Sequence, residues 1–160
     1  MADTDRLVIY YSLEGHTAHL ARAIAEAAGA DLLALEPEKP LPTRGFLKYL
    51  RGGLQALRKE APPLLPLAKD PAAYRTIFLG TPVWAGQPAP PMRSFLRHHP
   101  LRGKRIALRC SCRGMPGRTL AEMRAALAGE NEMVAEKIFV WRVDEAELLR
   151  EAAAWAKDVK

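Results

Sequence analysis

The sequence contains only two cysteines and has no long apolar run. So few cysteines exclude a scaffold held together by several disulfides and favour a reducing compartment. No apolar run approaches the roughly 18 residues that a membrane span needs. No basic region precedes the first apolar segment, which argues against a signal peptide. We therefore expect a cytoplasmic protein without a membrane partner.

Two common nucleotide-binding motifs are also missing. The chain has neither G-x-x-x-x-G-K-[ST] nor G-x-G-x-x-G, which excludes a P-loop and a Rossmann dinucleotide fingerprint. The composition is otherwise ordinary, with 49% hydrophobic and 26% charged residues, and this balance excludes wholesale disorder.

Acidic residues are scarce in the segment 93–124. It holds nine Lys and Arg against one acid, Glu122, whereas residues 1–80 carry ten basic and nine acidic residues. Such a local basic patch predicts an anionic partner. The segment has a single aromatic residue, Phe95, which argues against nucleic acid because stacking on bases needs aromatic side chains.

Five short apolar runs alternate with segments of helical periodicity. The runs predict strands over 7–11, 31–36, 76–80, 105–110 and 137–141. Apolar residues at helical spacing predict five helices between and after these strands. In chain order they are marked by Leu20 and Ile24; Phe46, Leu50, Leu54 and Leu57; Pro90, Phe95 and Leu96; Leu120, Met123 and Leu127; and Leu148, Ala152 and Trp155. Asp144 and Glu147 resemble a capping box at the start of the last helix. This alternation predicts one α/β domain over residues 1–160, with a parallel sheet covered on both faces.

Three loops, 12–17, 81–89 and 111–118, follow predicted strands at the edge of the sheet where ligands bind in such folds. The first combines Ser12, Gly15 and Thr17 with the start of a helix, which suits a phosphate held by hydroxyls and backbone N–H groups. The alternative is a simple helix cap at Ser12 or Thr17. In the second loop, Trp84 stands among small residues and prolines, so it is placed either to stack on a flat ligand or in the core.

Two motifs resemble those of the flavodoxin family: Y-S-L-E-G-H-T after the first strand and G-T-P-V-W-A-G-Q-P-A-P-P after the third. The resemblance covers nearly the whole chain. It implies a flavodoxin-like three-layer sandwich with a five-stranded parallel sheet of order 2-1-3-4-5, and a noncovalently bound FMN. The implied phosphate contacts are Ser12, Leu13, Glu14, Gly15, His16 and Thr17. The implied ring contacts are Pro82, Val83, Trp84, Ala85 and Gly86 on one side and Ser111, Cys112, Arg113 and Gly114 on the other.

The chain departs from the family pattern at two positions of the first loop. The family usually has Asn where His16 stands and often Thr where Glu14 stands. Because a phosphate dianion repels a carboxylate, we expect Glu14 to contribute its N–H and to turn its side chain outward. We expect Trp141 and Trp155 to lie in the core by position.

The resemblance implies electron transfer, either as a carrier between redox proteins or as a small NAD(P)H-linked reductase. The partner, a redox protein or NAD(P)H, would be anionic in either case, and a homodimer is left open. Two other classes also remain. The run from Cys112 to Arg118 has the C-x5-R spacing of cysteine-based phosphatases, and the basic segment could serve a flavin-free binding module. If the protein is not a phosphatase, we expect Cys110 and Cys112 to be buried small apolar residues.

Overall fold

A computed structural model describes residues 4–40, 46–142 and 144–160, and for residues 46–49 it describes the backbone only. The elements in chain order are β1 (Arg6–Tyr10), α1 (His16–Ala28), β2 (Asp31–Ala34), α2 (Phe46–Leu57), the short 3-10 helix η1 (Pro71–Ala73), β3 (Thr76–Trp84), β4 (Gln87–Pro88), α3 (Pro90–His98), β5 (Arg105–Cys112), α4 (Thr119–Leu127), β6 (Glu132–Val140) and α5 (Glu145–Asp158). Strands and helices alternate as predicted, apart from the short strand β4.

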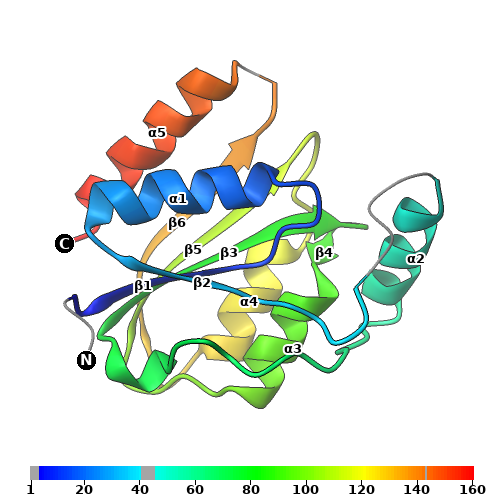
Figure 1. The fold of residues 1–160 in the computed structure, drawn as a ribbon, viewed down its shortest axis with the longest axis horizontal. Helices are drawn as coiled ribbons and strands as arrows, with labels where there is room; N and C mark the ends of the chain where they lie inside the picture. Colours follow the sequence, from blue (N-terminus) through cyan, green and yellow to red (C-terminus); the bar gives the residue numbers. More distant parts are fainter. Residues whose placement is uncertain (1–3, 41–45, 143) are drawn as a thin grey trace.

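The five long strands form a parallel sheet in the order β2-β1-β3-β5-β6 (Figure 1). This is the predicted order 2-1-3-4-5, so the α/β fold class is confirmed. The sixth strand, β4, was not predicted and pairs antiparallel with the end of β3. The carboxyl ends of β1, β3 and β5 therefore meet at one edge of the sheet.

Helices cover both faces of the sheet (Figure 1). Helices α1 and α5 pack on one face, where Val8, Phe78 and Phe139 are buried. Helices α3 and α4 pack on the other, where Met92 and Met123 meet the apolar side chains of the strands. The alternation along each strand explains these two layers, because successive side chains point to opposite faces. In the described part of the chain, none of the helices is long and apolar enough to cross a membrane.

Helix α2 stands apart from the two layers, beside the edge where the strands end (Figure 1). The helix predicted from the leucine stripe is confirmed, but those leucines do not pack in the core: Leu50, Leu54 and Leu57 are 46%, 41% and 60% exposed. The side chain of Phe46, the fourth member of that stripe, lies outside the described residues. On this helix, Gly52 and Ala56 are buried instead. Helical periodicity located the helix but not the face that packs.

The alternative for the first loop, a helix cap at Ser12 or Thr17, is wrong, because Gly15 is the cap residue of α1 and no side chain caps that helix. Asp144 is the cap residue of α5, as predicted, but its side chain makes no cap hydrogen bond. Trp155 is partly buried and packs its ring edge-on against Phe78 and Phe139, as expected for a core residue.

Candidate functional site

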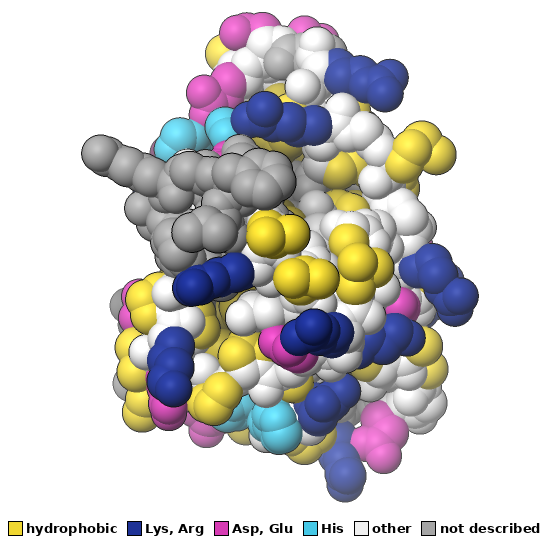
Figure 2. Space-filling view, turned by 90° about the vertical axis from the view of Figure 1, so that its right-hand side faces the viewer, with side chains coloured by type: hydrophobic (Ala, Val, Ile, Leu, Met, Phe, Trp, Pro, Cys, Tyr) yellow, Lys and Arg dark blue, Asp and Glu magenta, His cyan; other side chains and the backbone are white. Residues whose placement is uncertain are grey.

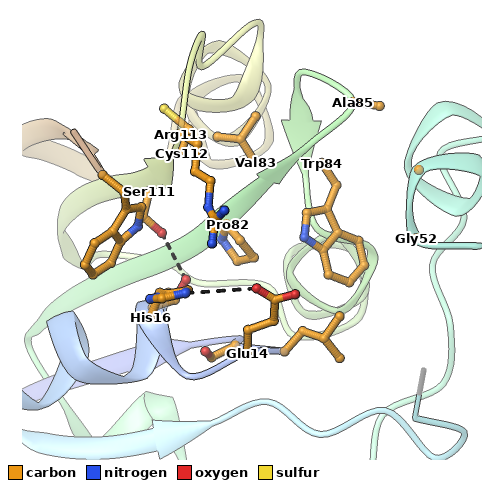
Figure 3. A pocket seen from close by; sticks show the side chains of 15 residues that line it. Glu14, His16, Gly52, Pro82, Val83, Trp84, Ala85, Ser111, Cys112 and Arg113 are labelled. Atoms are coloured by element: carbon orange, nitrogen blue, oxygen red, sulfur yellow. Dashed lines mark hydrogen bonds and ion pairs between the residues drawn. The ribbon is translucent and has the colours of Figure 1, made fainter. Parts of the chain in front are cut away.

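A cavity of about 330 Å³ opens where β1, β3 and β5 end (Figure 3). Below, it is called the pocket. Its lining includes twelve of the predicted site residues: Ser12, Leu13, Glu14, His16, Thr17, Pro82, Val83, Trp84, Ala85, Ser111, Cys112 and Arg113. The predicted residues Gly15, Gly86 and Gly114 do not line it. Gly52, Gly53 and Trp141 line it without having been predicted.

The start of α1 is open toward the pocket. Gly15 has a positive φ of 99°, a conformation that glycine adopts readily, and its N–H donates to Ser12 Oγ at 3.1 Å. Because no side chain caps α1, the N–H groups of its first turn keep their capacity to bind an anion. Thr17 and Ser111 are both buried and share a hydrogen bond of 2.9 Å between their hydroxyls, which joins α1 to β5.

The side chains of Glu14 and His16 lie next to each other in the pocket (Figure 3). The Glu14 carboxylate lies 4.0 Å from His16 Nε2, so the expectation that it turns outward is wrong. On its other side, the His16 ring lies 4.8 Å from the indole of Trp141, centroid to centroid. Trp141 is partly buried against the core, as predicted, and it also lines the pocket, which was not predicted.

Trp84 is carried by a tight hairpin. It pairs with Gln87 across a two-residue turn in which Ala85 and Gly86 both have positive φ, as in a type I′ turn. The indole meets the ring of Tyr11 edge-on, with centroids 5.6 Å apart, and also lines the pocket. A predicted loop is thus an ordered hairpin, and the indole is held by a buried tyrosine.

The end of β5 forms the opposite wall. Ser111 and Cys112 are still in the strand, and Arg113 reaches into the cavity beside Pro82 (Figure 3). The Cys112 thiol donates to the carbonyl of Gly114 at 3.3 Å. Burial raises the pKa of Cys112, so its thiol is held in the neutral form.

This environment argues against the phosphatase alternative. A nucleophilic cysteine needs a lowered pKa, whereas that of Cys112 is raised. Arg118, the other end of the C-x5-R spacing, is exposed at the start of α4 and does not line the pocket. Cys110 is fully buried, as expected for an apolar position, and burial raises its pKa to about 12. Within the described residues, no group of metal-ligating side chains could hold a metal ion.

The family model for flavodoxin matches residues 5–150 of the chain. The chain belongs to the flavodoxin family. This match confirms the resemblance that the two loop motifs predicted. It covers all five long strands and the loops that form the pocket, and it ends within α5.

Solved structures of other proteins share this fold. A protein from Bacteroides eggerthii, named as a candidate flavoprotein, superposes with a TM-score of 0.75 at 21% identity, covering 96% of each chain. A flavoprotein in complex with FMN from Lactobacillus acidophilus has a TM-score of 0.70 at 22% identity, covering 86% of this chain and 93% of its own. A flavodoxin, WrbA-like protein from Agrobacterium tumefaciens has a TM-score of 0.67 at 19% identity, covering 96% and 93%.

The pocket of this flavodoxin-family chain combines two kinds of chemistry. Uncapped helix N–H groups and the hydroxyls of Ser12 and Thr17 suit an anion, while Trp84 and Trp141 suit a flat ring system. Its volume lies within the range of about 300–1,000 Å³ that is usual for small-molecule sites. The arrangement therefore suits a planar aromatic ligand that carries a phosphate group.

Three residues that line the pocket were not predicted, because the sequence around them gives only weak indications of a ligand site. Gly52 and Gly53 interrupt a helical pattern, which can mark a close approach of a ligand. Trp141 follows the apolar run of the last strand, so its position resembled that of a core residue. Its indole reaches the pocket because β6 lies next to β5, and this neighbourhood exists only in the folded sheet.

Proposed function

We propose that this protein binds FMN in the pocket and transfers electrons through it. The observation that carries the proposal is the meeting of an uncapped α1 N-terminus with two tryptophans in one cavity, at the sheet edge where β1 and β3 end. The family match and the FMN complex of a structural neighbour support it. In flavodoxin-like sheets FMN is known to bind at the switch point between these two strands.

The residues present fit this cofactor. The first turn of α1, with Ser12 and Thr17, would hold the phosphate, and Trp84 and the end of β5 would flank the ring system. When bound, FMN supplies the redox chemistry, accepting and donating one or two electrons. The chain would orient the cofactor, and Trp84 and Trp141, which line the pocket, would help to exclude water from it.

FMN is expected to bind much more tightly than riboflavin, because only FMN offers a phosphate to α1. Replacing Thr17 with valine removes a hydroxyl at the phosphate end and should weaken FMN binding about tenfold, or about 1.4 kcal/mol. Riboflavin affinity should change little. Fluorescence titration of the apoprotein with both flavins measures these affinities.

Thr119→Val is the matched control. Thr119 is also a fully buried threonine, and its hydroxyl has no hydrogen-bond partner in the described structure. It lies at the start of α4, outside the pocket lining, so FMN affinity should stay the same. Equal affinities of the unmodified protein for FMN and riboflavin would contradict the proposed site.

We further propose that the electron partner is anionic and that the protein works as a small NAD(P)H-linked reductase. Exposed arginines flank the pocket: Arg113 lines it, Arg51 adjoins Gly52, and Arg142 adjoins Trp141. Figure 2 shows Lys and Arg side chains spread over the face that carries α2. Such a field attracts the phosphates of a nicotinamide dinucleotide or an acidic protein.

NADPH is expected to reduce the FMN-loaded protein under anaerobic conditions, and the bimolecular rate should fall several-fold when salt rises from about 50 to about 300 mM. Stopped-flow absorbance of the flavin measures this rate, with a neutral reductant of similar size as the control for general salt effects. Absence of reduction by both NADPH and NADH would contradict the reductase role. A salt-independent rate would contradict attraction by the basic face.

A further inference from the structure

Arg109 is a cation buried without a counter-ion. It lies in the middle of β5 and is 0% exposed, the largest side chain in the fully buried core. Its Nε and Nη1 have no hydrogen-bond partner. Among the ion pairs of the described residues, none involves Arg109. Burying an unpaired charge is costly, so this arginine calls for an explanation.

The fold makes a specific place for this side chain. Arg109 pairs in register with Gly80 of β3, and a Cβ on Gly80 would lie 2.3 Å from the Arg109 Cζ. The guanidinium can therefore lie across the sheet only because position 80 has no side chain. From there its Nη2 donates to the carbonyl of Thr17, in the first turn of α1, at 3.3 Å.

This position is one layer beneath the phosphate end of the pocket. The carbonyl of Thr17 accepts the hydrogen bond from Arg109, and the hydroxyl of Thr17 is hydrogen-bonded to that of Ser111. Both Thr17 and Ser111 line the pocket. The loop from Ser12 to Thr17 contains no Lys or Arg. Arg113, which also lines the pocket, is exposed to solvent, so water and salt screen its charge far more than they screen a buried charge.

Two positive charges lie at this end of the pocket, and the Glu14 carboxylate, which also lines the pocket, carries the opposite sign. The N-terminus of α1 carries a partial positive charge, and Arg109 adds a full one behind it. Burial lowers the pKa of Arg109 to about 9, which still leaves the side chain charged at neutral pH. A bound phosphate dianion would compensate both charges, and in a medium of low dielectric the attraction extends over several ångströms.

We propose that Arg109 is the buried cation that makes this pocket select a phosphorylated flavin over riboflavin. The inference rests on the proposed function. It assigns the selectivity to a residue that does not touch the ligand, and it implies that the empty protein is destabilised by the same charge. Arg109 is therefore a positioning and specificity residue, acting by its field and by its bond to the first turn of α1.

The test compares Arg109→Met, Arg109→Lys and the control Arg22→Met, which removes an exposed arginine from helix α1. In Arg109→Met, FMN affinity should fall at least about tenfold while riboflavin affinity stays within about twofold. The apoprotein should melt at the same or a higher temperature, because an apolar side chain replaces an unpaired charge. Arg109→Lys should keep most of the preference for FMN, and Arg22→Met should keep all of it.

Inorganic phosphate alone provides a second readout. It should raise the melting temperature of the wild-type apoprotein and should do so less in Arg109→Met. An unchanged ratio of FMN to riboflavin affinity, or an equal loss for both flavins with a lower melting temperature, would overturn the inference. If Arg109→Met does not fold, loss of the FMN preference in a folded Arg109→Lys decides against it. Wild-type protein that binds neither flavin would instead refute the proposed function itself.

Discussion

Gly80→Ala is expected to destabilise the protein by about 3 kcal/mol, a severe effect for the addition of one methyl group. The new Cβ would lie 2.3 to 2.7 Å from three atoms of the Arg109 guanidinium. A side chain on the surface could move aside, but Arg109 is fully buried and its guanidinium donates to the carbonyl of Thr17 in α1. At about 2–4 °C per kcal/mol, the melting temperature should fall by roughly 6–12 °C.

A double-mutant cycle with Arg109→Leu tests the cause of this loss. Leucine has no atoms at the positions of the guanidinium, so Gly80→Ala should cost much less in that background, with a coupling energy of about 1–3 kcal/mol. Urea unfolding of the four proteins measures it. Additive effects of the two substitutions would show that the contact between residues 80 and 109 is not the source of the destabilisation.

Gly117→Ala is expected to cost about 2–4 kcal/mol and to disturb the pocket as well. A Cβ there would lie 2.5 Å from both the Cα and the carbonyl oxygen of Gly86, and φ at Gly117 is 57°. Backbone atoms cannot move aside as the end of a side chain can. The N–H of Arg118 also donates to the Gly86 carbonyl at 2.8 Å. The hairpin that carries Trp84 is therefore held against the loop that follows β5.

Gly114→Ala is the matched control for this prediction. It lies in the same loop, but nothing is within 4 Å of its added Cβ and its φ is not positive. Its stability should change by less than about 0.5 kcal/mol. FMN titration and urea unfolding should both separate the two variants. Similar behaviour of Gly114→Ala and Gly117→Ala would mean that the contact between Gly86 and Gly117 does not hold the hairpin.

The polar loops of the pocket could be read from the sequence because their signals are local. A buried strand followed by Ser12, Gly15 and Thr17 indicates a helix start suited to an anion, whatever the rest of the chain does. The order of strands came from the resemblance of two motifs to the flavodoxin family, and the sheet confirms it. The direction of a side chain within a loop could not be predicted as well from the sequence. Repulsion between Glu14 and a phosphate predicted that its side chain turns outward, but the side chain turns toward His16.

Features that depend on distant partners were missed for one physical reason. Trp141 and Arg109 lie in or beside apolar runs, and periodicity describes them only as strand residues. What they contact is set by neighbours far along the chain: His16 for Trp141, and Gly80 with Thr17 for Arg109.

Helix α2 shows the same limit, because its leucine stripe located the helix, whereas the exposure of those leucines is seen only in the structure. The sequence by itself therefore determined the alternation of strands and helices, the family and the pocket's polar loops, since these depend on local patterns and motifs. Only the tertiary structure decided which aromatic rings reach the pocket and which charge lies buried beneath it, because those contacts join residues that come together only when the sheet forms.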